Sequence, residues 1–584
     1  MPLIGTAGHV DHGKSTLIQR ITGRDPDRWD EEKRRGLTID LGFAWSTLPD
    51  GTEISFVDVP GHERYLKNML AGIEAIDVAL FVVAADEGWM PQSEEHLAVL
   101  DLLEVDRGVV ALTKVDTVDA DLVGLARAEV EDKLAGTSLS QAPVMAVSAA
   151  SGEGMEELIE SLTAQLPEEP VPNGRPRLWV DRSFTLPGAG TIVTGSLLGS
   201  GLAVDDAVVV LPAGLTTRIR GLHSHEHARK SVAPGRRVAV NLAGLDHDSI
   251  GRGDMLGLPG QWETTSRFTV SLRPARFVEE IEQRGAYQLH IGSAAHRVGI
   301  VAIDDEAAVM RVDTRLPLAA GDRFILRDTG RKLVVGGGRV IDPEPGPTRR
   351  ALAGAAATRS GMDPDDIADR LLASRRVERV DRLVAHSGGG RPKSAVLVGG
   401  LAVAPVVIEE LEETAYSLVE AEHRIHPLRP GLPIATMAER LGVEASVTEA
   451  IVERSTRLER RGPDVARPGH EPRLTQSQET SWREACDRLA AGLAVPDLAT
   501  LGLDAEIVHH KVRTGELIWV SERLAYLPSQ IEEIESLMTG FDGEFTVADF
   551  RDAAGLSRKY AVPILEWSDR EGLTLRRGDL RRLK

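Results

Sequence analysis

The sequence predicts a multidomain protein with an α/β domain, two β-barrels and a C-terminal array of winged-helix modules, each a helix-turn-helix followed by a β-wing. Up to about residue 172, continuous apolar strands such as Val78–Val83 alternate with helical stretches, which is typical of a parallel sheet covered on both faces. Short β-rich segments punctuated by glycine follow to about residue 345 and favour small barrels. Beyond residue 350, amphipathic helices rich in Ala, Arg and Glu take over.

The composition is that of a large, acidic, globular chain. Its 584 residues correspond to roughly four domains at about 150 residues each. The 68 Lys and Arg against 89 Asp and Glu give a net charge of −21, which excludes a uniformly basic coat for nucleic acid. The single cysteine, Cys486, excludes an intramolecular disulfide and a cysteine-rich zinc site and fits a reducing cytosol. Because the most apolar run, Val78–Ala85, is far short of the about 20 residues of a membrane span and no cleavable signal is visible, we expect a cytoplasmic protein.

Proline-rich segments and a recurrent phrase divide the chain. Prolines gather at residues 167–174 and 343–347, between the three regions. In the last region a short phrase ends at Gly442, Gly502 and Gly555, spaced by 60 and 53 residues, which suits a winged-helix module. A fourth module is suggested by length alone, without the phrase, just after residue 350. The expected domains are residues 1–172, 175–262, 265–345, 350–411, 412–477, 478–527 and 528–584.

Residues 8–15, Gly-His-Val-Asp-His-Gly-Lys-Ser, match a phosphate-binding loop. The motif follows the predicted strand at residues 3–6 and opens a helix at Ser15, which is the context it requires. Backbone N–H groups of the loop and the helix N-terminus would surround the phosphates, Lys14 would reach the outer phosphates, and the Ser15 hydroxyl would bind Mg²⁺. The segment therefore predicts a nucleoside triphosphate site.

Further motifs follow predicted strands in the order expected of a GTP site. Asp58 would hold the Mg²⁺ shell through water, the Gly61 N–H would sense a γ-phosphate, and Thr38 lies in a polar stretch that could fold over the metal. Asp116 can accept hydrogens from N1 and N2 of guanine, which selects GTP over ATP. Ligands bind at the carboxyl ends of parallel strands, where these motifs lie. The predicted GTP-binding residues are Gly8, His9, Val10, Asp11, His12, Gly13, Lys14, Ser15, Thr16, Asp58, Gly61, Thr113, Lys114, Asp116, Ser148 and Ala149, and the predicted Mg²⁺ residues are Ser15, Thr38 and, through water, Asp58.

The phosphate loop, Arg35-Gly-Leu-Thr38 and Asp58-Val-Pro-Gly-His62 resemble the translational GTPases of the elongation factor Tu class. The resemblance implies that His62 positions the hydrolytic water when the ribosome engages, and that Val10 and Leu37 form an apolar gate before it. It also implies conversion of GTP to GDP and phosphate. Where the family has Asn, this chain has Thr113, so we expect an altered brace on the phosphate loop and faster loss of GDP.

About 235 residues follow the second barrel, which ordinary elongation factors of this class lack. Together with the segments at 181–195, 233–244 and 327–342, this extension resembles the bacterial selenocysteine-specific elongation factors, the SelB family. The resemblance implies a monomer that delivers selenocysteinyl-tRNA to the ribosome at UGA codons while bound to a hairpin of the selenoprotein mRNA, with GTP hydrolysis on codon recognition.

The same resemblance places an aminoacyl pocket on the first barrel, at Asp181, Arg182 and Arg237. A selenol is ionised at neutral pH, so an arginine would separate it from neutral serine and cysteine. A hydrogen bond to that anion contributes about 1.5 to 3 kcal/mol, roughly tenfold to a hundredfold in affinity. For Arg182, an ion pair with Asp181 at the barrel rim is an alternative.

Basic residues gather at the C-terminus. From Ser557 onward the chain has eight basic and four acidic residues, a local charge of +4. They fall at a predicted recognition helix and wing, which are the parts of a winged helix that contact nucleic acid. The charges do not separate RNA from DNA, and RNA follows from the resemblance. The predicted RNA-binding residues are Arg558, Lys559, Arg576, Arg577, Arg581 and Arg582.

Three alternatives stay open at this stage. His223, His225 and His227 alternate along one predicted strand and suggest either a metal site or a polar loop near the acceptor end of the tRNA. The protein could serve ordinary aminoacyl-tRNA, although the extension and the arginine pocket argue against this. It could also be a DNA-binding regulator whose GTPase domain is a switch.

Overall fold

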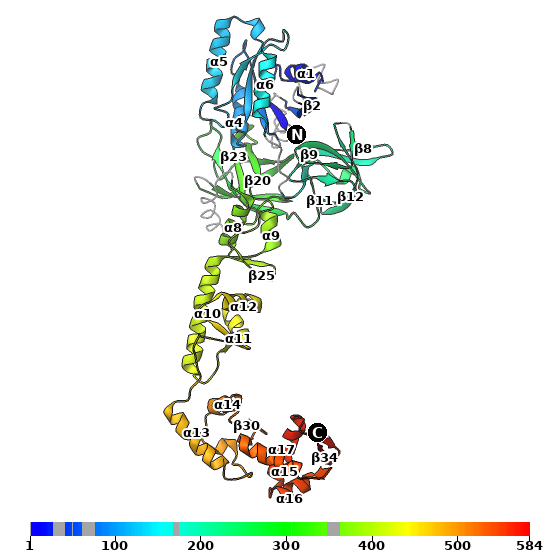
Figure 1. Ribbon diagram of the computed structural model, residues 1–584. Coiled ribbons are helices and arrows are strands. Elements are labelled where there is room, and N and C mark those ends of the chain that lie inside the picture. The colour runs from blue at the N-terminus through cyan, green and yellow to red at the C-terminus, as the bar shows by residue number, and fades with distance from the viewer. Residues whose placement is uncertain are drawn as a thin grey trace. The chain divides into compact units, whose positions relative to one another are not determined.

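A computed structural model describes residues 2–26, 41–48, 51–60, 76–167, 174–225, 227–304, 307–346 and 362–584. The chain divides into two compact units, Met1–Ala404 and Pro405–Lys584, each of which is considered by itself (Figure 1). Within the described residues, no helix is both long and apolar enough to cross a membrane.

The first domain is an α/β sandwich around a six-stranded sheet in the order β2-β3-β1-β4-β5-β6. Only β2 is antiparallel to its neighbour. Helices α1 and α6 lie on one face of the sheet, and α4 and α5 lie on the other (Figure 1). Apolar residues of each pair pack against the sheet. The strands are β1 (Leu3–Gly8), β2 (Gly42–Thr47), β3 (Glu53–Asp58), β4 (Val78–Ala84), β5 (Gly108–Thr113) and β6 (Val144–Ala146), and the helices are α1 (Lys14–Thr22), α4 (Pro91–Leu102), the 3₁₀ turn η2 (Val115–Thr117), α5 (Ala120–Leu134) and α6 (Met155–Gln165).

Two six-stranded antiparallel barrels follow. Pairing of β11 with β12 closes the first, and pairing of β17 with β23 closes the second. The first barrel consists of β7 (Arg177–Trp179), β9 (Gly190–Leu198), β11 (Ala207–Leu211), β12 (Leu215–Ser224), β15 (Arg236–Leu242) and β16 (Met255–Gly257), with β8 (Arg182–Leu186), β10 (Leu202–Ala203), β13 (His227–Arg229), β14 (Ser231–Val232) and η3 (His247–Ser249) at its margins. The second consists of β17 (Thr265–Ser271), β19 (Tyr287–Ile291), β20 (Ala294–Ile303), β21 (Ala307–Leu316), β22 (Arg323–Asp328) and β23 (Leu333–Asp342), with β18 (Arg273–Pro274) beside β23.

The barrels contact each other and the α/β domain through buried polar and apolar groups. Between the barrels, the buried Arg177 forms a bidentate ion pair with Asp322. Helix α4 packs on β23, and Arg339 donates from Nε to Glu104 Oε2 at 2.9 Å. The second barrel therefore rests on the helix that covers one face of the nucleotide-binding sheet.

The first unit ends in two helices and a small sheet of order β24-β26-β25. The chain between them and the second barrel, residues 347–361, lies outside the described residues. The elements are α8 (Pro364–Arg375), β24 (Val377–Arg379), α9 (Val380–His386), β25 (Val396–Val398) and β26 (Leu401–Val403). The first unit ends at Ala404, and the next helix, α10 (Pro405–Ile425), runs through the boundary expected at residues 411–412. The other domain limits read from the sequence stay predictions.

The second unit repeats the order of helices and short antiparallel strands that defines a winged helix. Gly442, Gly502 and Gly555, which end the recurrent phrase, have φ of 68°, 75° and 63°, so each supplies the left-handed residue that follows a helical turn. The elements are α10 (Pro405–Ile425), β27 (Leu432–Pro433), α11 (Ile434–Leu441), α12 (Ala445–Arg454), β28 (Glu459–Arg461) and β29 (Asp464–Ala466); then α13 (Gln476–Leu489), η4 (Leu498–Thr500), α14 (Ala505–Arg513), β30 (Ile518–Trp519) and β31 (Ala525–Tyr526); then α15 (Pro528–Thr539), β32 (Phe545–Thr546), α16 (Val547–Ala553), α17 (Arg558–Arg570), β33 (Thr574–Arg577) and β34 (Leu580–Leu583).

Candidate nucleotide-binding site and associated surfaces

The predicted phosphate loop lies between β1 and α1, at the carboxyl edge of the sheet. Its backbone is left-handed at Gly8, Asp11 and Gly13, with φ of 129°, 64° and 87°. A Cβ at Gly8 would lie 2.1 Å from the Val82 carbonyl oxygen, so only glycine fits there. Helix α1 begins at Lys14, and among the described residues no side chain caps its N-terminus. A helix N-terminus at the end of such a loop is a site at which an anion can bind.

The structure brings Lys14, Ser15 and Asp58 together beneath this loop. Buried Lys14 spans the loop, since its Nζ donates to the Gly8 carbonyl oxygen at 3.0 Å. Ser15 Oγ donates to Asp58 Oδ2 at 2.6 Å, and Thr6 Oγ1 donates to Asp58 Oδ1 at 2.7 Å. A hydroxyl and a carboxylate held in contact at a helix N-terminus form the kind of oxygen donor set that Mg²⁺ binds. The residues present fit the ion predicted from the sequence.

The base-recognition motif follows β5. The Thr113 hydroxyl donates to the His12 carbonyl oxygen at 2.7 Å, so the residue that stands in place of Asn still braces the phosphate loop through a shorter side chain. Lys114 pairs with Asp86 and Glu87. Asp116 is exposed in η2, available to a base. Ser148 and Ala149 follow β6, the parallel neighbour of β5, so both motifs lie at the same edge.

Burial keeps two histidines at the loop, His12 and His96, neutral. It lowers the pKa of His12 to about 4 and that of His96 to about 3. Neither ring therefore carries a positive charge at neutral pH beside Lys14. The loop presents the ammonium group and backbone N–H groups as its donors.

Several predicted site residues lie outside the described residues. These are Thr38, Gly61 and His62, and also Leu37 of the proposed gate. The hydrolytic role of His62 and the metal role of Thr38 stay predictions.

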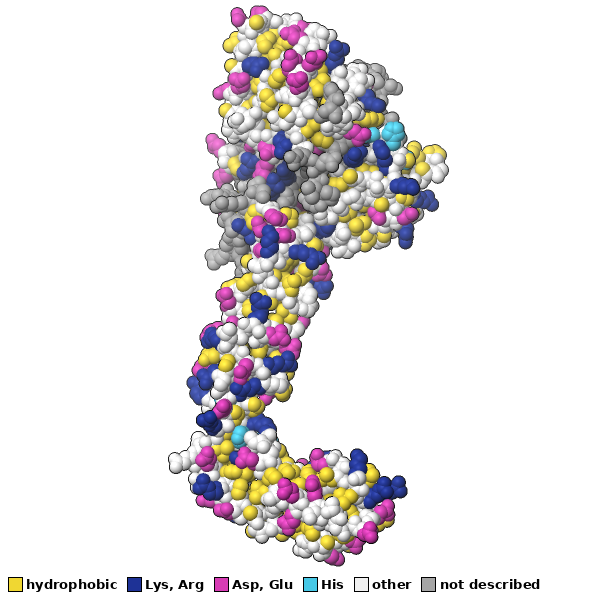
Figure 2. Space-filling model, in the orientation of Figure 1, with side chains coloured by type: hydrophobic (Ala, Val, Ile, Leu, Met, Phe, Trp, Pro, Cys, Tyr) yellow, Lys and Arg dark blue, Asp and Glu magenta, His cyan; other side chains and the backbone are white. Residues whose placement is uncertain are grey.

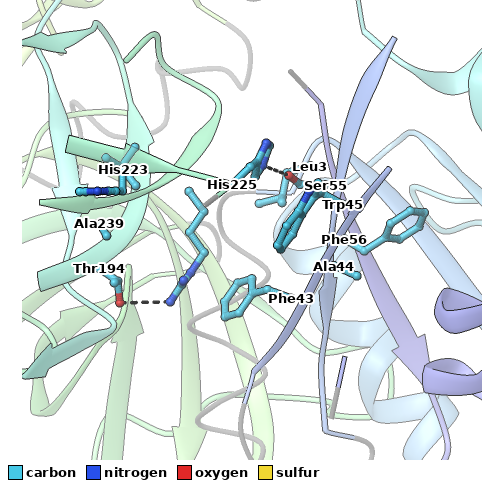
Figure 3. Close-up of a pocket in the computed structure, with 12 residues that line it drawn as sticks. Leu3, Phe43, Ala44, Trp45, Ser55, Phe56, Thr194, His223, His225 and Ala239 are labelled. Carbon is cyan, nitrogen blue, oxygen red and sulfur yellow. Dashed lines mark hydrogen bonds between the residues drawn. The ribbon is translucent and has the colours of Figure 1, made fainter. Parts of the chain in front are cut away.

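A cavity of about 250 Å³ lies between β2 and β3 of the α/β domain and the first barrel (Figure 3). Arg237 of β15 lines it, whereas Asp181 and Arg182 do not. Asp181 instead holds Arg237, whose Nη2 and Nε donate to the carboxylate at 2.9 and 3.2 Å. Thr194 Oγ1 accepts from the same Nη2 at 3.1 Å, and the guanidinium carbon lies 3.8 Å from the centre of the Phe43 ring.

Arg182 is oriented differently from Arg237. Its Nη2 donates to the Leu41 carbonyl oxygen at 3.1 Å, so it contacts the segment that leads into β2. The carboxylate of Asp181 pairs with Arg237. The three predicted pocket residues are thus neighbours, but Arg237 alone faces the cavity.

The histidines of the first barrel do not gather around one point. His225 stacks on Trp45, with ring centres 5.3 Å apart, and its Nε2 lies 3.0 Å from Ser55 Oγ (Figure 3). His223 lines the cavity, while His227 begins β13. Of the described residues, only Glu263, Glu344 and His386 bring three metal-binding side chains within reach of one another. Arg382 pairs with both of these carboxylates.

Basic side chains gather over the C-terminal module (Figure 2). Those of Arg558, Lys559 and the wing residues Arg576, Arg577 and Arg582 are exposed. Arg581 is 3% exposed, and its guanidinium binds Asp569 through Nε and Nη2. The structure contradicts the interpretation of Arg581 as a surface contact for RNA, because its side chain points into the module.

Comparison with known proteins gives three matching family models. They are the elongation factor Tu GTP binding domain over residues 1–168, the selenocysteine-specific elongation factor β-barrel domain over 265–347, and the elongation factor SelB winged helix over 541–583. The selenocysteine-specific elongation factor of Desulfomicrobium baculatum is 34% identical, covering 100% of both chains. That of Escherichia coli K12 is also 34% identical, covering 99% of this chain and 98% of the relative.

This chain belongs to the selenocysteine-specific elongation factor family. A crystal structure of the bacterial selenocysteine-specific elongation factor EF-Sec matches it with a TM-score of 0.70 at 26% identity, covering 100% of both chains. Membership confirms the predicted fold class of a GTPase domain, two β-barrels and C-terminal winged-helix modules, and the structure shows six strands in each barrel. Like other translational GTPases, this chain binds and hydrolyses GTP.

Sequence reasoning missed two residues of this elongation factor that hold its phosphate loop. His96 Nδ1 accepts from the Gly8 N–H at 2.9 Å, and Gln92 Oε1 accepts from the Val10 N–H at 3.1 Å. Both residues lie on α4, more than 80 positions from the loop. The local pattern of α4 gave no signal, since a polar residue on a helix indicates a solvated face before the partner is known.

Proposed function

We propose that this elongation factor delivers selenocysteinyl-tRNA to the ribosome at UGA codons while bound to a hairpin of the selenoprotein mRNA, and that GTP hydrolysis follows codon recognition. The proposal places the protein in the cytoplasm as a monomer. Ser15 and Asp58, with Thr38, would hold Mg²⁺, which would neutralise charge on the phosphates.

The observation that carries the proposal is the arrangement of Arg237. Its Nε and Nη2 are occupied by Asp181 and Thr194, which fix the plane of the guanidinium. Among the described residues, no oxygen accepts from Nη1, and the side chain lines the cavity. A fixed guanidinium with a donor left for a ligand suits recognition of a small anion.

A selenolate is such an anion, whereas a seryl hydroxyl is neutral. A charge-assisted hydrogen bond to the selenolate would therefore favour the selenocysteinyl ester. The apolar rings of Phe43 and Trp45 line the same cavity. Because they exclude water, they would strengthen that hydrogen bond.

Recognition of the mRNA rests on the last winged helix. Its exposed arginines and lysine at the start of α17 and in the wing would contact phosphates or base edges of the hairpin. Residues 557–584 carry a local charge of +4 on a chain of net charge −21, so the positive field is concentrated at the recognition helix and the wing.

The decisive experiment measures the affinity of the GTP-bound protein for selenocysteinyl-tRNA and for the same tRNA carrying serine. Arg237→Ala should reduce the ratio of the two affinities by tenfold to a hundredfold, corresponding to about 1.5 to 3 kcal/mol. The matched control is Arg236→Ala, since Arg236 is the neighbour on β15, pairs with Glu53 and does not line the cavity. Equal losses for both tRNAs with Arg237→Ala would mean that the residue holds the acceptor end of the tRNA and would contradict its role in selecting selenium.

A further inference from the structure

Two side chains of α4 accept hydrogen bonds from the phosphate loop itself. Nδ1 of His96 receives the Gly8 N–H, and Oε1 of Gln92 receives the Val10 N–H. His96 is 2% exposed, so the bond at Gly8 lies in a region without competing water. Gln92 and His96 are one helical turn apart, so one face of α4 carries both acceptors.

These bonds fix the orientation of two peptide groups in a loop that binds phosphates through its other N–H groups. Gly8 and Gly13 have left-handed backbones and lack a Cβ, so without restraint the loop has many conformations. Ordering a mobile loop on nucleotide binding would cost conformational entropy and weaken affinity. A loop that is already held in place loses little entropy. The N–H groups of Gly8 and Val10 therefore serve as anchors of the loop.

Helix α4 is itself held from the opposite side, which makes its acceptors rigid. Glu95 Oε1 accepts from the Val334 N–H of β23 at 3.3 Å. The apolar residues of α4 from Leu97 onward share a core with Ile325 and Val334 of the second barrel. The acceptors thus lie on an element packed between the sheet and the barrel. Movement of Gln92 or His96 away from the loop would require displacement of the whole helix.

We infer that Gln92 and His96 are positioning residues that hold the phosphate loop in its nucleotide-binding conformation. Both act through the backbone of the loop, at Gly8 and Val10. The inference concerns nucleotide binding by the protein alone, so it goes beyond the proposed roles in tRNA and mRNA recognition and does not depend on them. The depressed pKa of His96 is consistent with it, because an unprotonated Nδ1 remains an acceptor at neutral pH.

The test uses the full-length protein and fluorescent derivatives of GDP and GTP. His96→Leu removes the acceptor at similar volume and should weaken binding of both nucleotides about tenfold, or about 1.4 kcal/mol, because the buried Gly8 N–H loses its partner. His96→Asn places an amide oxygen close to the position of Nδ1 and should restore affinity to within about threefold of the parent, within about 0.7 kcal/mol. Gln92→Met, which keeps the side-chain length at a less buried position, should also weaken both nucleotides.

The matched control is His290→Leu. His290 is a buried histidine of the second barrel whose pKa burial lowers to about 3, as for His96, but it lies outside the nucleotide site. The His290→Leu variant should leave nucleotide affinity unchanged. Its midpoint of thermal unfolding measures the general cost of losing a buried imidazole. Unchanged affinity in both His96→Leu and Gln92→Met would overturn the inference, as would equal weakening by His96→Leu, His96→Asn and His290→Leu.

Discussion

Individual side chains of the nucleotide site are specialised by what surrounds them. Lys14 is buried beside neutral histidines and carries the positive charge of the loop, while Asp116 is exposed and carries the negative charge that would meet the base. Thr113 lies between these two functions, since its hydroxyl ties the base-recognition strand to the phosphate loop. Base selection and phosphate binding are thereby joined through one short side chain.

Asp116→Asn should shift nucleotide preference from GTP to xanthosine triphosphate. An amide can donate a hydrogen bond where the xanthine ring offers an oxygen, whereas a carboxylate requires the two donors of guanine. Competition between the two triphosphates for the variant and the parent measures the change. GTP affinity that stays at the parental value in the variant would show that the base is bound elsewhere.

The position of a charged residue within its helix or strand decides whether its side chain is exposed or buried. In the strand β34, Arg581 and Arg582 point to opposite faces, as successive residues of a strand do. Arg581 faces inward and pairs with Asp569 of α17, which joins the wing to the recognition helix. Arg582 faces outward beside Leu575, its partner across the hairpin.

This difference predicts two distinct phenotypes for neighbouring alanine variants. Arg581→Ala should destabilise the module by about 3 kcal/mol, because it leaves Asp569 without its partner in a partly buried site. Arg582→Ala should change stability by less than about 0.5 kcal/mol but weaken binding of the mRNA hairpin. Thermal unfolding and hairpin titration of both variants separate the effects. A stable Arg581→Ala protein with lost RNA affinity would return Arg581 to the set of direct contacts.

At the scale of the molecule, the GTPase domain and the predicted RNA-binding module belong to separate compact units. The second unit begins at Pro405 with the start of α10 and contains its own apolar cores. One of these cores joins the last two modules, since residues of α13 to α17 share it. The unit therefore has what a chain needs to fold by itself.

An isolated fragment of residues 405–584 should bind the mRNA hairpin without any nucleotide. Affinity should fall as salt rises, because each phosphate contact releases about 0.7 to 0.9 of a counterion. Replacing Arg576 and Arg577 by Ala should flatten that dependence if they contact phosphates, whereas lost discrimination between hairpin sequences at an unchanged slope would mean that they read bases. A fragment of residues 405–526 that binds as tightly would place the RNA site in an earlier module.

The order of the domains and the motifs of the nucleotide site could be predicted from local sequence patterns. The phosphate loop, Asp58, Thr113 and the motif at Ser148 each follow a short apolar strand, and parallel strands bring their carboxyl ends to one edge whatever the details of packing. Glycines with an obligatory left-handed backbone, such as Gly8 and Gly442, also leave a local signal. These features depend on neighbours in the chain and on a general rule of topology.

Only the tertiary structure decided which polar groups meet across long separations. His96 and Gln92 can be recognised as anchors of the loop only once α4 is packed beside β1. Arg237 and Arg182 differ in their contacts with the α/β domain, since Arg237 lies over the Phe43 ring and Arg182 donates to the Leu41 carbonyl oxygen. The burial of Arg581 likewise depends on Asp569. Charge and spacing show that a guanidinium or an imidazole is present, but the free energy of its interactions is set by the side chains that exclude water around it and the acceptor that it reaches.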